Sequence, residues 1–94
     1  MGMARPADEQ TAREEIVKRL ARIAGHAASL KRMWEEGRQI DDMLTQVAAV
    51  RAALDQVGRA ILELHIDESV AKAVEHGQAE DAIRDLKEAL DRFV

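Results

Sequence analysis

"IDDMLTQVAAVRAALDQVGRAILEL", residues 40–64, carries the most regular hydrophobic pattern of this chain. Its large apolar residues recur at alternating intervals of three and four positions: Ile40, Met43, Val47, Val50, Leu54, Val57, Ile61 and Leu64. An α-helix turns by about 100° per residue, so residues at these intervals form one continuous apolar stripe. A pattern that is unbroken over this length predicts a long helix packed lengthwise against another helix.

The segment before this stretch carries a second stripe of the same kind, formed by Ile16, Leu20, Ile23, Ala27, Leu30 and Trp34. Thr11 and Glu14 fit a capping box that would begin this helix, and Gly37 is suited to end it. After Gly77 a third, shorter segment is also amphipathic. We predict helices at about 12–36, 39–76 and 79–93, with residues 1–10 as a mobile tail and 1–94 as a single domain.

The composition indicates how these helices complete a core. The chain has 94 residues, of which 2% are aromatic, and it contains one proline and no cysteine. This composition favours helices over sheet, and a short chain with few bulky residues gains most of its burial by oligomerising. We therefore predict an all-α fold, a three-helix protomer whose long hairpin pairs with a second hairpin as a four-helix bundle.

The charge is distributed unevenly along the chain. The formal net charge is −4, yet residues 16–34 contain five basic residues and no acidic residue: Lys18, Arg19, Arg22, Lys31 and Arg32. The average therefore conceals a local positive surface. No apolar run reaches membrane-spanning length, and the first residues lack the apolar segment of a secretory signal, so we expect a cytoplasmic protein with no membrane partner.

Two segments resemble a known family. They are "RLARIAGHAASLKRMWEEGR", residues 19–38, and "LTQVAAVRAALDQVGRAILELHI", residues 44–66. Together with a histidine near the end of the second long helix, they resemble the CsoR/RcnR/FrmR family of metal- or formaldehyde-sensing transcriptional repressors. The resemblance is fairly specific, because ordinary bundle patterning would not demand Gln46 or Arg51.

The resemblance implies an antiparallel four-helix bundle dimer, usually assembled further into a dimer-of-dimers tetramer. It also implies a repressor that binds operator DNA and releases it when an effector occupies a sensing site between protomers. By position, Ile40 replaces the first cysteine of that site, His65 is the histidine, and Ser69 replaces the last ligand. The chain is therefore identified as a cysteine-less member of the family, a homodimer or homotetramer.

The missing cysteines leave the effector open. Copper(I) requires soft sulfur ligands, which neither isoleucine nor a hydroxyl group supplies, so copper(I) is disfavoured. One hypothesis is a divalent metal held by His65, with Asp41, Asp42 and Glu68 as possible partners. The competing interpretation of these residues is a solvated acidic helix face with a packed histidine. A second hypothesis is a repressor that senses a small organic molecule or has no ligand at this site. No cofactor is required by the sequence.

The resemblance implies DNA contacts by Lys18, Arg19, Arg22 and Arg51, and Lys31 and Arg32 extend this set. The simpler interpretation of these charges is an ordinary solvated bundle surface. An alternative function is a helical oligomeric protein-interaction module without DNA binding, acting through the acidic second half of the chain. An enzyme is not indicated, because the sequence has no nucleophile–base pair, phosphate loop or complete metal motif.

Overall fold

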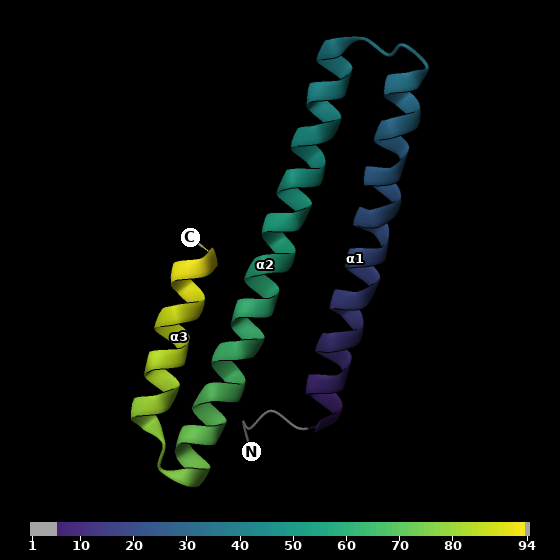
Figure 1. Ribbon diagram of the computed structural model, residues 1–94. Coiled ribbons are helices and arrows are strands. Elements are labelled where there is room, and N and C mark those ends of the chain that lie inside the picture. The colour runs from purple at the N-terminus through teal and green to yellow at the C-terminus, as the bar shows by residue number, and fades with distance from the viewer. Residues whose placement is uncertain (1–5, 94) are drawn as a thin grey trace.

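The computed structural model describes residues 6–93, and their side chains from residue 9 onward. It contains α1 (Pro6–Glu35), α2 (Ile40–His76) and α3 (Ala79–Phe93). Helices α1 and α2 form a long antiparallel hairpin, and α3 folds back along the other side of α2 (Figure 1). The predicted all-α, three-helix protomer is confirmed. Within residues 6–93, no helix combines the length and apolar character needed to cross a membrane.

Both predicted glycine stops end their helices. Gly37 has φ of 81°, and the Arg38 N–H donates to the Met33 carbonyl at 3.1 Å, which completes a Schellman motif. Gly77 has φ of 66°, and its N–H donates to the Ala73 carbonyl at 3.0 Å. Left-handed backbone is costly for any residue with a Cβ, so these two glycines set the lengths of α1 and α2.

The N-terminus differs from the prediction. Helix α1 begins at Pro6, so residues 6–10, which we predicted as tail, are helical, while residues 1–5 lie outside the described part. Thr11 consequently lies inside the helix and is not its N-cap. Proline is well suited to the first helical turn, because its fixed φ is already helical and its missing N–H would have no partner there.

The apolar stripe of α2 divides into two lines, each with a period of seven residues. Met43, Val50 and Val57 form the buried line, and Val57 is only 3% exposed. The other line is exposed in the protomer and consists of Ile40, Val47, Leu54 and Ile61. One hairpin therefore uses half of the stripe, and the other half has no covering surface within the described chain.

The packing face of α1 is rotated from the predicted stripe. Ile16, Ile23 and Leu30 are half-buried as expected, but Leu20, Ala27 and Trp34 are exposed, Trp34 by 62%. The positions one residue earlier face α2 instead: Arg19, His26 and Met33. His26 is accommodated because its Nε2 lies 2.7 Å from the Gln46 Oε1 across the helix pair. A pattern based on apolar residues alone missed these polar members of the seam.

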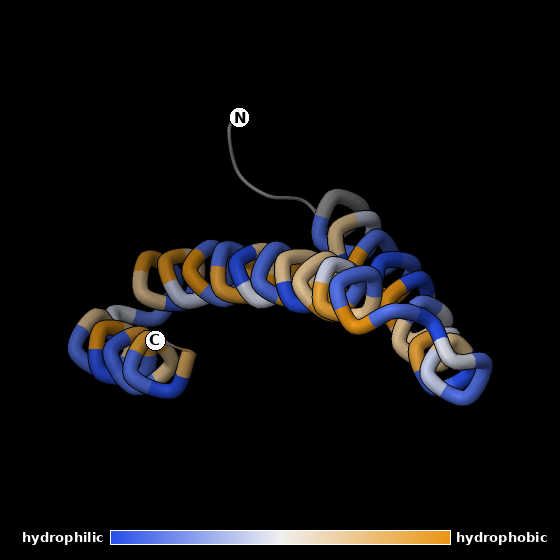
Figure 2. The backbone as a smooth tube through the Cα atoms, turned by 90° about the horizontal axis from the view of Figure 1, so that it is seen from above, coloured by the Kyte–Doolittle hydropathy of each residue, from blue (hydrophilic) through white to orange (hydrophobic). Residues whose placement is uncertain are grey.

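Helix α3 contacts α2 and, among the described residues, makes no contact with α1. The Phe93 ring lies directly over Gly58, where a Cβ would overlap it. Figure 2 shows α1 and α3 on the two sides of α2, with apolar segments along the whole length of α2. The fold is therefore an extended three-helix layer, 57 × 28 × 16 Å, rather than a protein with one central core.

Candidate nucleic-acid interface and sensing site

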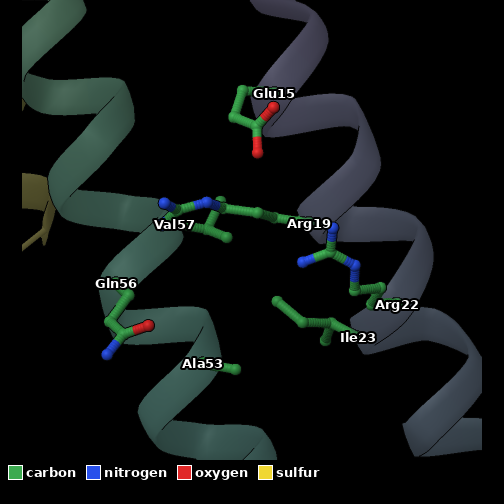
Figure 3. Close-up of a pocket in the computed structure, with 7 residues that line it drawn as sticks. All are labelled: Glu15, Arg19, Arg22, Ile23, Ala53, Gln56 and Val57. Atoms are coloured by element: carbon green, nitrogen blue, oxygen red, sulfur yellow. The ribbon is translucent and has the colours of Figure 1, made fainter. Parts of the chain in front are cut away.

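A hollow of about 300 Å³ lies between α1 and α2 at mid-length. We call it the α1–α2 hollow; its lining consists of Glu15, Arg19, Arg22, Ile23, Ala53, Gln56 and Val57. Arg19 occupies a seam position, and its side chain crosses toward α2 near Val57 (Figure 3). Arg22 follows on the next turn and also lines the hollow. The seam thus presents two guanidinium groups where most helix pairs would bury apolar side chains.

The basic residues of α1 differ in how their charge is compensated. Lys31 pairs with Glu35 at 3.2 Å and Arg32 with Glu36 at 4.0 Å, each four residues apart. Lys18, Arg19 and Arg22 form no ion pair within 4.0 Å among the described residues. All three are exposed. On α1, the basic side chains without an ion pair among the described residues are therefore those around residues 18–22.

Lys18 stands outside the lining of the hollow, four residues before Arg22 and hence on the same face of α1. Arg51 does not join them. It lies on α2 between Val47 and Leu54, on the exposed apolar line. Within one protomer, the structure thus groups Arg19 and Arg22, places Lys18 beside them, and leaves Arg51 on another face.

The three positions of the predicted sensing site are far apart in the protomer. Ile40 is the first residue of α2 and is 64% exposed. His65 and Ser69 lie in the opposite half of the same helix. Twenty-five residues of helix at 1.5 Å each separate Ile40 from His65 by about 37 Å. These positions can meet only through a second copy of the chain.

His65 and Ser69 themselves lie at one place, a hollow of about 150 Å³ between α2 and α3. The lining of this α2–α3 hollow consists of His65, Glu68, Ser69, Lys72, Gln78, Asp81, Ala82 and Asp85. Ser69 is 6% exposed, the one buried polar residue among those described. Sequence reasoning missed Asp81 and Asp85, because they reach the hollow only when α3 folds back.

The predicted metal ligands are not gathered within one protomer. Asp41 and Asp42 lie in the first turn of α2, far from His65. Glu68 is adjacent to His65 but forms an ion pair with Arg13 of α1. Residues 9–93 contain no group of three or more histidine, aspartate or glutamate side chains placed to hold a metal ion. A nitrogen–oxygen metal site would thus need ligands from two chains, and it stays a prediction.

Comparison with known proteins places the chain in a family. Residues 12–92 match the metal-sensitive transcriptional repressor family. The copper-sensing repressor CsoR of Bacillus subtilis is 36% identical over 81 residues, covering 86% of this chain and 80% of that protein.

Two solved structures have the same fold. The nickel-responsive transcriptional regulator InrS superposes with a TM-score of 0.80 at 47% identity, covering 86% of this chain and 91% of the other. The copper(I)-bound CsoR of Geobacillus thermodenitrificans superposes with a TM-score of 0.78 at 41% identity, covering 85% and 83%. This chain, which has no cysteine, therefore belongs to the metal-sensitive transcriptional repressor family.

Proposed function

We propose that this protein represses transcription by binding operator DNA as a homo-oligomer, with Lys18, Arg19 and Arg22 contacting backbone phosphates. The observation that carries the assignment of residues is the group of exposed basic side chains without an ion pair on α1, beside a hollow lined by two arginines. Each basic side chain that neutralises a phosphate releases condensed counterions, so even a modest patch contributes to affinity. Repetition of the patch in every subunit multiplies this effect and offsets the net charge of −4.

The exposed apolar lines support self-association. In α1 the exposed apolar residues Leu20 and Trp34 each come one position after a residue that faces α2. In α2 the exposed line comes four positions after the buried line, as Val47 comes after Met43. Both steps rotate in the same sense about the helix axis, and in antiparallel helices the same sense leads to the same side of the hairpin. A second hairpin on that side would complete an antiparallel four-helix bundle, and two such dimers would form a tetramer. Arg51 would then lie at or beside the subunit junction.

We propose that the effector of this repressor is not copper(I). The chain has no cysteine, and Ile40 presents an apolar side chain where a thiolate would be needed. An antiparallel dimer would bring Ile40 of one chain toward the partner's His65. The two chains would then form a shared pocket with one apolar wall and one polar wall. Such a pocket suits a small organic molecule, or a zinc, nickel, cobalt or manganese ion with nitrogen and oxygen ligands. The protein would act in the cytoplasm, where its operator lies.

The test is binding to a duplex from the region upstream of the protein's own coding sequence, compared with an unrelated duplex at several salt concentrations. We expect preferential binding to the upstream duplex, with log affinity falling linearly as log salt rises. Equal or absent binding to both duplexes would favour the alternative, a protein-interaction module.

Arg22→Ala tests the residue assignment, because it removes from the α1–α2 hollow one of its two guanidinium groups. We expect about three- to tenfold weaker binding and a smaller salt slope. Arg92→Ala is the matched control, since Arg92 is an exposed arginine in the last turn of α3. If both variants bind like the wild type, the assignment of α1 as the DNA-contacting face is wrong.

A further inference from the structure

We infer that Glu15 limits the affinity of the α1–α2 hollow for phosphate, as a built-in competitor for Arg19 and Arg22. The inference rests on the proposed function, because it concerns the same surface. It assigns a role to an acidic residue that lies just before the basic segment and lines the same hollow as the two arginines.

The position of Glu15 is the first part of the argument. Residues 15, 19 and 22 are spaced by four and then three, so they share one face of α1. In the view of Figure 3, the Glu15 carboxylate is directed into the space beside the Arg19 side chain, and the Arg22 guanidinium lies beyond it. Among the described residues, no ion pair within 4 Å is shown for Glu15. The carboxylate thus lines the same hollow as both cations without being fixed to either.

The chemistry of the lining is the second part. Of the seven residues that line the hollow, Glu15 is the acidic one, two are arginines, and the remainder are neutral. A carboxylate and a phosphate oxygen are both anionic acceptors for a guanidinium group. A phosphate that enters the hollow therefore meets a like charge and competes for the same donors. Binding of every duplex is weakened, whatever its base sequence.

Glu14 provides a comparison that separates direction from charge alone: it lies four residues before Lys18 and outside the lining of the hollow. It precedes Glu15 directly and is also exposed. A step of one residue rotates its side chain by about 100°, and it does not line the hollow. Replacing either residue by glutamine changes the net charge of the protein equally, so the pair separates a local effect from a general one.

The experiment compares Glu15→Gln with Glu14→Gln by fluorescence anisotropy, using the upstream duplex and an unrelated duplex of equal length at several salt concentrations. For Glu15→Gln we expect about three- to tenfold tighter binding of both duplexes, from one like charge removed at short range. We also expect a steeper salt slope, because Arg19 and Arg22 become fully available to phosphate. For Glu14→Gln, which neighbours Lys18 but not the two arginines of the hollow, we expect a smaller gain and a smaller change of slope.

Three results would overturn the inference. Equal gains for the two variants would mean that Glu15 acts only through net charge. Weaker binding of the upstream duplex by Glu15→Gln would mean that the carboxylate accepts a hydrogen bond from a base. If the wild type binds neither duplex, the proposed function fails, and the role of Glu15 fails with it. Circular dichroism and sedimentation of both variants confirm that helix content and assembly are unchanged.

Discussion

The two hollows of this protein differ in how complete they are within one chain. The α1–α2 hollow is built from a single hairpin, and the seam of that hairpin positions Arg19 and Arg22. The α2–α3 hollow contains His65 and Ser69, but the third position of the predicted site, Ile40, lies at the far end of α2. The proposed DNA-contacting residues of the α1–α2 hollow therefore lie together within one protomer, whereas the three predicted sensing positions could meet only through assembly.

This difference suggests how the two sites would be coupled. A ligand that bridges two chains changes the energy of their association, and a repeated phosphate-binding surface depends on how the chains are arranged. Glu68 links the α2–α3 hollow to helix α1, since it lines that hollow and pairs with Arg13. Exposed ion pairs of this kind contribute little to stability, so assembly is the stronger connection.

The largest expected effect comes from restoring sulfur ligands to the incomplete site. The double substitution Ile40→Cys and Ser69→Cys should raise the affinity for copper(I) by several orders of magnitude, because two thiolates would join His65 across the dimer. Competition with a chromogenic copper(I) chelator under anaerobic conditions measures it.

A third substitution, Leu54→Asp, provides the control. Leu54 is 48% exposed in the protomer and lies on the line that we assign to the dimer. The charge should prevent association and abolish copper(I) binding, without unfolding the hairpin. Tight binding by this monomeric triple variant would contradict the conclusion that the site is shared between chains.

The next effect is on stability of the hairpin that holds the α1–α2 hollow. Val57→Asp would place an unpaired carboxylate at the most buried apolar position, 3% exposed, and should cost about 3 kcal/mol or more. Urea unfolding followed by circular dichroism measures the loss. Val74→Asp, at a position that is 80% exposed, should change stability by about 0.5 kcal/mol or less. Similar losses for both variants would show that burial between the helices does not set the cost of the charge.

The smallest effect tests the polar contact in the seam. Gln46→Leu removes the acceptor that faces His26 and should cost about 1 kcal/mol, which lowers the melting temperature by about 4–8 °C for a domain of this size. Gln56→Leu makes the same chemical change at an exposed position and should leave the melting temperature nearly unaltered. A stable Gln46→Leu variant would mean that the hydrogen bond does not hold the register of the hairpin.

The sequence-based predictions were accurate where a feature depends on residues that are near in the chain, and less accurate where it depends on contacts between distant segments. The ends at Gly37 and Gly77 were predicted correctly, because a left-handed residue is a local requirement. The start of α1 was missed, since the residues after Pro6 carry no apolar period. The packing face of α1 was predicted correctly at Ile16, Ile23 and Leu30 and was wrong by one position at the other three members of the stripe. Arg19 and His26 occupy seam positions that a count of apolar residues excludes.

The residues of the candidate sites likewise include some that the sequence identified and some that only the structure revealed. Arg19 and Arg22 were identified from the family resemblance and from a basic segment that is visible in the sequence. Glu15 and Asp85 were not, because a carboxylate near a functional group is recognised only when its direction is known. No pattern within α1 distinguishes Glu15 from Glu14.

Residue type and short-range spacing were sufficient to establish the helical class, the two glycine stops, the period of α2 and the family. Tertiary structure decided which half of the α2 stripe is buried, that Arg19 faces α2, and that α3 brings acidic residues to His65. These outcomes depend on how the helices rotate against one another. That rotation is set by the sum of many side-chain contacts between segments distant in the chain, which no single segment of the sequence contains.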